Sequence, residues 1–292
     1  MAQAQGSLTR RARHLVLGSG LAWFLSLSLV LVLSGCTVNS AKNRYILAEK
    51  LWTNGNYAAS VTEFERVVAK DPRGKLGLQA LYRAAMTQSL YLSKHEDAVR
   101  KLRTFVEVSG DVNLNWEAQK QIGEILFSKT EQYENSIQHY RILVKQRPDA
   151  PELPEFLYRI GKSHFYLWQF DEAIAAFRDL IKRFPTSSQA EKGAYEIGLS
   201  HYTRGEHNPG GQGPATESYQ EAMDAYQRFI RNYPKSPLVS EAKFGIASCL
   251  EELDQLDAAY HQFEALLKTY HSPKVIRIKL TRIRERQAQK SR

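Results

Sequence analysis

Residues 158–185 read YRIGKSHFYLWQFDEAIAAFRDLIKRFP, and this stretch decides the fold. The spacing of its apolar residues predicts two antiparallel helices, from about Glu155 to Trp168 and from Asp171 to just before Pro185. An acidic pair opens the second helix and a basic pair closes it, as the helix dipole favours. Small residues, Gly161 and Ala173, stand where the two backbones must approach each other closely.

The same helix pair recurs along the chain. One small residue in the second helix of each pair marks the period, at Ser60, Ala98, Ser136, Ala173, Ala222 and Ala259, with intervals of 38, 38, 37, 49 and 37 residues. This pattern of small, aromatic and proline positions resembles the tetratricopeptide repeat. We therefore predict an all-α protein, a superhelix of about six helix-turn-helix repeats over residues 43–273, because stacked repeats form one elongated body.

The interval of 49 residues locates an insertion near residues 205–217. Residues 205–214 read GEHNPGGQGP, and four glycines and two prolines in ten residues predict a loop. Two interpretations stay open. The loop is either a surface excursion without a role or a docking element, since insertions between repeats often mark the functional face of a solenoid.

The N-terminus predicts export. Three arginines precede an uncharged apolar run, Leu15 to Leu33, which is followed by Ser34, Gly35 and Cys36. The run is long enough for an uncleaved membrane anchor, but its end resembles the lipobox of bacterial lipoproteins. The resemblance implies a signal peptide over 1–35, lipidation (palmitate) at Cys36, a lipidated tether over 36–42, and a periplasm-facing position at the outer membrane, because residue 37 is not Asp.

The net charge of +9 is concentrated at the ends of the chain. Residues 274–292 hold eight Lys or Arg and one Glu, whereas residues 36–273 are close to neutral. Apolar residues at helical spacing, Ile276, Leu280 and Ile283, predict a basic C-terminal capping helix and tail over 274–292. Its charge fits either a solvated cap or a contact with anionic lipid, cell-wall polymer or an acidic partner. No aromatic interleaving supports nucleic acid.

Catalytic motifs are absent, so we predict a protein that is not an enzyme and holds no cofactor or metal. The histidines are scattered along the repeats without a cluster at ligand spacing, and two cysteines form no disulfide framework. Cys249 lies in an apolar stretch and is expected to be a small buried side chain.

The inner wall of a tetratricopeptide superhelix is built by the first helix of each repeat. Indexing the repeats predicts a partner-binding groove lined by Tyr45, Trp52, Phe127, Tyr158, Phe165, Tyr195 and Tyr202, with Lys162 and Lys192 among them. Aromatic anchors of this kind often dominate binding to a partner. The alternative is that some of these rings only fill gaps between helices.

A closer resemblance covers residues 184–253. The segments FPTSSQAEKGAYEIGLSHY and ATESYQEAMDAYQRFIRNYPKSPLVSEAKFGIASCLEEL, with the interruption between them, resemble the BamD family of outer-membrane lipoproteins. The resemblance implies a role in outer-membrane β-barrel protein assembly, with envelope proteins as partners, such as a barrel-assembly subunit or unfolded outer-membrane proteins. The chain departs from that family because four repeats precede the interrupted one. The alternative is a periplasmic scaffold that coordinates peptidoglycan synthesis or cell division with the outer membrane.

Overall fold

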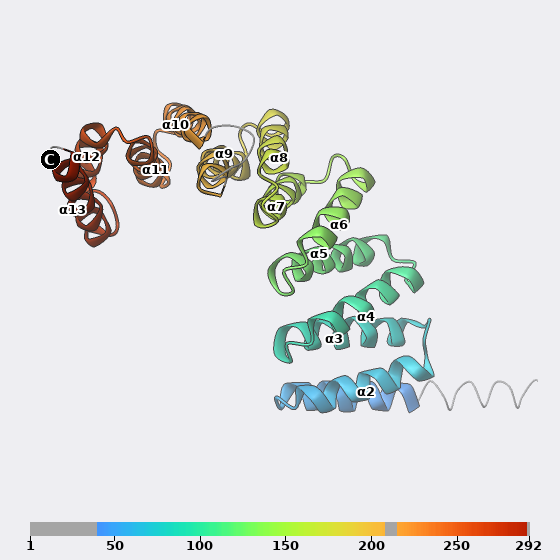
Figure 1. The fold of residues 1–292 in the computed structure, drawn as a ribbon. Helices are drawn as coiled ribbons and strands as arrows, with labels where there is room; N and C mark the ends of the chain where they lie inside the picture. Colours follow the sequence, from blue (N-terminus) through green and yellow to red (C-terminus); the bar gives the residue numbers. More distant parts are fainter. Residues whose placement is uncertain (1–39, 208–214, 291–292) are drawn as a thin grey trace, which may run out of the picture. The chain divides into compact units, whose positions relative to one another are not determined.

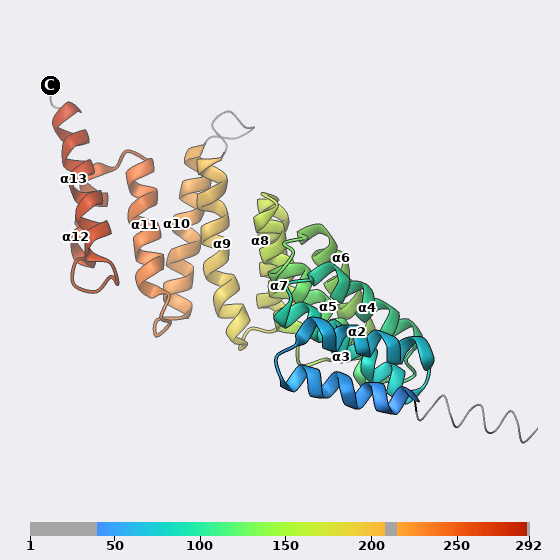
Figure 2. The same cartoon turned by 90° about the horizontal axis from the view of Figure 1, so that it is seen from below.

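The computed structural model describes residues 40–207 and 215–290, and every regular element in them is an α-helix (Figures 1 and 2). The helices are residues 40–53, α2 (Tyr57–Lys70), α3 (Lys75–Tyr91), α4 (His95–Val108), α5 (Val112–Ser128), α6 (Tyr133–Gln146), α7 (Leu153–Tyr166), α8 (Phe170–Arg183), α9 (Ser188–Glu206), α10 (Ala215–Asn232), α11 (Val239–Glu252), α12 (Leu256–Leu266) and α13 (Pro273–Lys290). The predicted all-α repeat fold is confirmed. The predicted signal peptide and the lipidation site at Cys36 lie outside the described residues.

The chain divides into two compact units, Met1–Ile125 and Leu126–Arg292, with the boundary inside α5. Within each unit, helices that follow one another in sequence pack together, as in α2, α3 and α4 of the first unit or α6 to α9 of the second. Separate buried clusters hold them, including one around Phe64 and one around Phe177. This neighbour-on-neighbour packing is the arrangement that stacked repeats require.

Glycines permit the closest crossings. A Cβ on Gly161 would lie 2.5 Å from the Phe177 ring, so the small residue predicted at the crossing of α7 and α8 is required there. In the same way, the buried ring of Tyr226 lies between Gly198 and Gly245, where added Cβ atoms would approach it to 2.6 and 2.5 Å. These contacts fix the spacing of the helices, since interiors tolerate no such overlap.

The turn inside a repeat closes through one residue with positive φ. Five turns show it, at Gly55, Ser93, Glu131, Trp168 and Asp254, with φ between 51° and 76°. A left-handed residue after a helix lets the chain reverse. The prediction that Trp168 is helical was therefore wrong, because α7 ends at Tyr166 and Trp168 forms the turn.

Two predicted boundaries need correction. Residues 40–42 of the expected tether are helical, because Ala41 is buried in the cluster around Phe64. Helices also enter both ends of the expected insertion. Gly205 is buried in α9, where a Cβ would lie 2.8 Å from the Tyr219 ring, and α10 begins at Ala215. The rest of the insertion, residues 208–214, lies outside the described residues.

The basic C-terminal segment packs as a helix, α13. Ile276, Leu280 and Ile283 are buried, as their spacing predicts. Its charges are used structurally, because the side chain of Glu251 on α11 is fully buried and needs a partner. Lys279 Nζ lies 2.9 Å from Glu251 Oε2, and Arg282 contacts the same carboxylate. The helix therefore binds to the last repeat by both apolar contact and opposite charge.

Candidate functional site

The four tyrosines predicted to line the groove pack against the second helix of their own repeat. The ring pairs are Tyr45 with Phe64 (5.4 Å), Tyr158 with Phe177 (5.8 Å), Tyr195 with Phe229 (5.9 Å) and Tyr202 with Tyr219 (5.6 Å). All four are half-buried, and burial raises the pKa of Tyr195 to about 12. The rings thus fill the space between paired helices, and partner binding by them stays a prediction.

Lys162 is committed to a buried carboxylate. Its Nζ lies 3.0 Å from Oε1 of Glu196 on α9, and the Tyr158 hydroxyl donates a hydrogen bond of 3.0 Å to the same oxygen. Burial raises the pKa of Tyr158, and the nearby negative charge of Glu196 adds to the effect. Glu196 itself is buried, so Lys162 neutralises a charge that would otherwise be costly. Lys192, in contrast, is exposed.

The other predicted aromatics lie beside the turns inside the repeats, where they meet rings that the sequence analysis had not selected. In the first unit Trp52 contacts Tyr57 and Tyr91, with ring centroids 6.0 and 5.8 Å apart. Tyr57 and Tyr91 stack at 4.2 Å. Arg83 lies over the Trp52 ring at 4.7 Å. This cluster joins the ends of neighbouring repeats within the first unit.

A longer series, which we call the turn-edge ladder, lies in the second unit. Its ring contacts are Phe127–Tyr133 (5.9 Å), Tyr133–Tyr166 (4.9 Å), Tyr166–Phe165 (5.9 Å), Phe165–Phe170 (5.7 Å), Phe170–Trp168 (6.2 Å) and Trp168–His207 (3.8 Å). The rings lie at the ends of α5 and α7, at the starts of α6 and α8, in the turn between α7 and α8, and at the residue that directly follows α9. Residues far apart in sequence thus form one aromatic surface.

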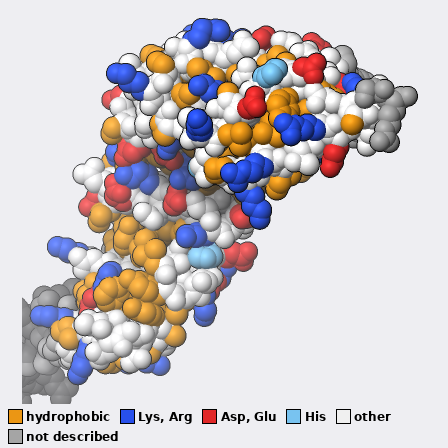
Figure 3. Space-filling model, turned by 90° about the vertical axis from the view of Figure 1, so that its left-hand side faces the viewer, with side chains coloured by type: hydrophobic (Ala, Val, Ile, Leu, Met, Phe, Trp, Pro, Cys, Tyr) orange, Lys and Arg blue, Asp and Glu red, His pale blue; other side chains and the backbone are white. Residues whose placement is uncertain are grey.

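Tyr166, Trp168 and His207 of the ladder are exposed to solvent, and cations flank it. Tyr166 is 43% exposed and Trp168 is 58% exposed. Lys162 Nζ lies 4.8 Å from the Phe165 centroid, and the Arg159 guanidinium lies 4.4 Å from that of Phe127. On the face drawn in Figure 3, hydrophobic side chains gather in patches with Lys and Arg between them. Lys162 is paired with Glu196 and Arg159 with Glu155, so the exposed aromatic surface itself is the feature suited to binding a protein segment.

Trp168 occupies an unfavourable backbone conformation. Its φ of 63° lies in the left-handed region, where a bulky residue costs about 1–3 kcal/mol. Gly55 takes the same place in the first repeat, with φ of 76°. Ser93, Glu131 and Asp254 take this place in other repeats, so Trp168 is the one bulky apolar residue at these five turns. Sequence reasoning could have found it from a tryptophan standing where the first repeat has glycine.

A buried histidine, His201, lies on α9. His201 Nδ1 is 3.1 Å from Glu221 Oε2. Arg204 also binds the Glu221 carboxylate, and its Nη1 lies 2.6 Å from Asp171 Oδ1. Burial lowers the pKa of His201 to about 4, which outweighs the attraction of Glu221. The neutral imidazole is therefore the form that the fold accommodates.

This burial predicts a pH dependence of stability. The pKa of His201 lies below the unfolded value of about 6.5, so the unfolded chain binds more protons below that pH. We expect the free energy of unfolding to fall as pH drops from about 6.5 towards 4, by roughly 1 kcal/mol or more per pH unit once protonation begins. Urea unfolding at several pH values measures this. His201→Gln should remove part of the slope, and an unchanged slope would contradict the assignment.

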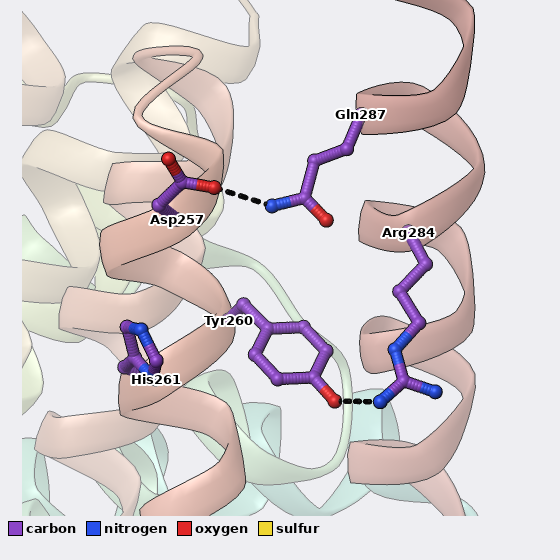
Figure 4. A pocket seen from close by; sticks show the side chains of 5 residues that line it. All are labelled: Asp257, Tyr260, His261, Arg284 and Gln287. Atoms are coloured by element: carbon purple, nitrogen blue, oxygen red, sulfur yellow. Dashed lines mark hydrogen bonds between the residues drawn. The ribbon is translucent and has the colours of Figure 1, made fainter.

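A shallow pocket lies between α12 and α13 (Figure 4). Gln287 Nε2 donates a hydrogen bond of 2.6 Å to Asp257, and the Arg284 guanidinium donates one to the Tyr260 hydroxyl. His261 completes the lining. Since its polar groups are paired across the two helices, we assign the pocket to the packing of α13.

Within residues 40–207 and 215–290, no helix is both long and apolar enough to cross a bilayer.

Solved structures resemble this chain at low sequence identity. The C-terminal part of a tetratricopeptide (TPR) repeat-containing protein from Cytophaga hutchinsonii is 20% identical, with a TM-score of 0.52 over 77% of this chain and 78% of that chain. PilW, a type IV pilus biogenesis factor, is 15% identical, with a TM-score of 0.48 over 83% and 97% of the two chains. PilF of Pseudomonas aeruginosa is 14% identical, with a TM-score of 0.45 over 87% and 99%.

Sequence comparison adds the family. A search of curated proteins found no match. The model of the YfiO family, described as outer membrane lipoproteins, matches residues 127–281, which is more than half of the 292 residues. The matched segment begins at Phe127 and contains the whole turn-edge ladder, from Phe127 to His207. The chain therefore belongs to the YfiO family of outer membrane lipoproteins.

Proposed function

We propose that this protein is a non-enzymatic, protein-binding scaffold, attached to the outer membrane through lipid on Cys36 and facing the periplasm. Its role is that of a BamD-like component in the assembly of outer-membrane β-barrel proteins. The family match supports an envelope location, and the resemblance of residues 184–253 to BamD supports the specific role. The repeat fold supports binding of protein segments, because stacked helix pairs present extended surfaces.

The observation that carries this proposal is the turn-edge ladder. Its exposed rings, Tyr166 and Trp168, lie in one series with half-buried Tyr133, buried Phe170 and exposed His207, so an extended segment can contact the exposed rings in turn. Alternate side chains of such a segment point to one face, and apolar or aromatic ones would pack on the rings. The terminal strand of an unfolded barrel protein has this chemistry, and we assign it as the ligand.

We expect the double variant Tyr166→Ala, Trp168→Gly to bind a fluorescent peptide copied from a barrel-protein terminal strand at least about tenfold more weakly. Stability should be nearly unchanged, because glycine relieves the positive φ of Trp168 and offsets the lost ring contacts. Fluorescence titration gives the affinity, and thermal unfolding gives the stability.

Ile142→Ala is the matched control, because Ile142 on α6 is 50% exposed in the same unit but is not part of the ladder. Its affinity should equal that of the wild type. Wild-type affinity of the double variant would refute the ladder as the site, and a collapse of its melting temperature would show that these rings belong to the core.

Pull-down from solubilised envelopes tests the role in barrel assembly. Recovery of cell-wall synthesis or division proteins without a barrel protein would favour the alternative scaffold.

A further inference from the structure

The first helix of the stack, residues 40–53, has a face that the other described residues leave uncovered. Its buried side holds Ala41 and Ala48, and the opposite side exposes Lys42, Asn43, Ile46, Leu47 and Lys50. We call these five residues the open end face. Ile46 and Leu47 are 56% and 43% exposed, which is unusual for adjacent large aliphatic side chains.

Comparison with later repeats shows that the equivalent face is covered there. Counting back from the positive-φ residues Gly55, Ser93 and Trp168, the positions of Asn43, Leu47 and Lys50 correspond to Leu81, Ala85 and Gln88 in α3 and to Phe156, Ile160 and Ser163 in α7. All six of these equivalents are buried. In the second unit, α7 packs against both α6 and α8. The first helix presents the same face without a preceding repeat among the described residues.

We propose that the open end face rests on a membrane surface that carries anionic phospholipid headgroups. The inference builds on the proposed attachment at Cys36. In that mature chain only residues 36–39 precede the helix, too few to form a covering helix of their own. Four residues span at most about 14 Å, so the lipid would hold the start of this helix close to the bilayer.

The charges of the face fit this surface. Lys42 and Lys50 flank the two aliphatic side chains, and basic residues beside an apolar strip bind anionic interfaces. The one acidic residue of the helix, Glu49, is occupied by Arg83, with Nε–Oε1 at 3.0 Å. A symmetric contact with a second copy would bring the lysines of both copies together. Contact with α13 would oppose them to the exposed Lys274 and Arg277.

The test uses the mature chain with Cys36→Ser, so that binding does not depend on acylation. We expect it to sediment with vesicles of phosphatidylethanolamine and phosphatidylglycerol in equal parts. Ile46→Ser with Leu47→Ser should lower the vesicle-bound to free ratio at least about tenfold, as should Lys42→Glu with Lys50→Glu. Leu90→Ser with Leu114→Ser is the control, because these residues are 62% and 46% exposed in the same unit. It should bind as the wild type does.

In the following outcomes, the parent chain is the mature chain that carries only Cys36→Ser. Three results would overturn the inference. The parent chain could stay in the supernatant, its Ile46→Ser, Leu47→Ser variant could sediment as the parent does, or the parent could be a dimer that this variant dissociates. The last would show that a second copy covers the face. Circular dichroism melting checks that each variant folds. The same variants are titrated with the barrel-terminus peptide. An unsubstituted ladder that fails to bind the peptide, in a chain that still binds the vesicles, would count against the proposed function alone.

Discussion

Replacing Lys279 and Arg282 with alanine is expected to lower the free energy of unfolding of the last repeat by about 2–4 kcal/mol. The two side chains lie on α13 and neutralise Glu251, whose side chain is fully buried. A buried carboxylate without its cations costs several kcal/mol, because no water can solvate it. The expected loss of stability is smaller than for a buried carboxylate without any cation, because Arg286 Nη1 remains 3.9 Å from Glu251 Oε1. Hydrogen exchange of α11, α12 and α13 locates the loss.

Two controls make this prediction specific to the buried charge. Adding Glu251→Gln to the double variant should restore part of the stability, because the uncompensated charge is then gone. Arg277→Ala removes an exposed cation from the same helix and should change stability by less than about 0.5 kcal/mol. If Arg277→Ala destabilised as much as the double variant, the effect would come from the general charge of α13 and the assignment to Glu251 would be wrong.

If the chain is attached to the outer membrane through lipid on Cys36, as we propose, Cys36→Ser is expected to abolish that attachment. Acyl chains contribute about 0.8 kcal/mol of membrane-binding free energy per buried methylene, so their loss removes most of the free energy that holds the chain at the membrane. The variant should accumulate with residues 1–35 uncleaved and disappear from the outer-membrane fraction. Immunoblotting of separated membranes and mass measurement of the purified chain check both outcomes.

The second cysteine provides the control for this experiment. Cys249 is buried, and burial raises the pKa of its thiol to about 12, which makes it unreactive. Cys249→Ala should therefore leave processing and fractionation as in the wild type. Outer-membrane recovery of the Cys36→Ser variant at the wild-type level would exclude acylation as the anchor, and it would leave the apolar run before it or the open end face as the membrane attachment.

The sequence by itself determined the repeat architecture. The helix pair over residues 158–185 and its recurrence required only local periodicity, helix-end charges and small residues at crossings, and these signals act within one repeat. The same holds for the apolar side of α13, where Ile276, Leu280 and Ile283 are buried as their spacing indicates. Boundaries were less certain, because a turn residue such as Trp168 carries no periodicity of its own.

Only the tertiary structure decided which aromatic rings meet and which charges are free. Tyr133 meets Tyr166, and Trp168 meets His207, across neighbouring repeats. These contacts depend on how the repeats stack, which no spacing within one repeat encodes. Lys162 and the basic residues of α13 likewise read as free cations in sequence. In the fold they face Glu196 and Glu251, because packing buried those carboxylates and opposite charge is what makes such burial tolerable.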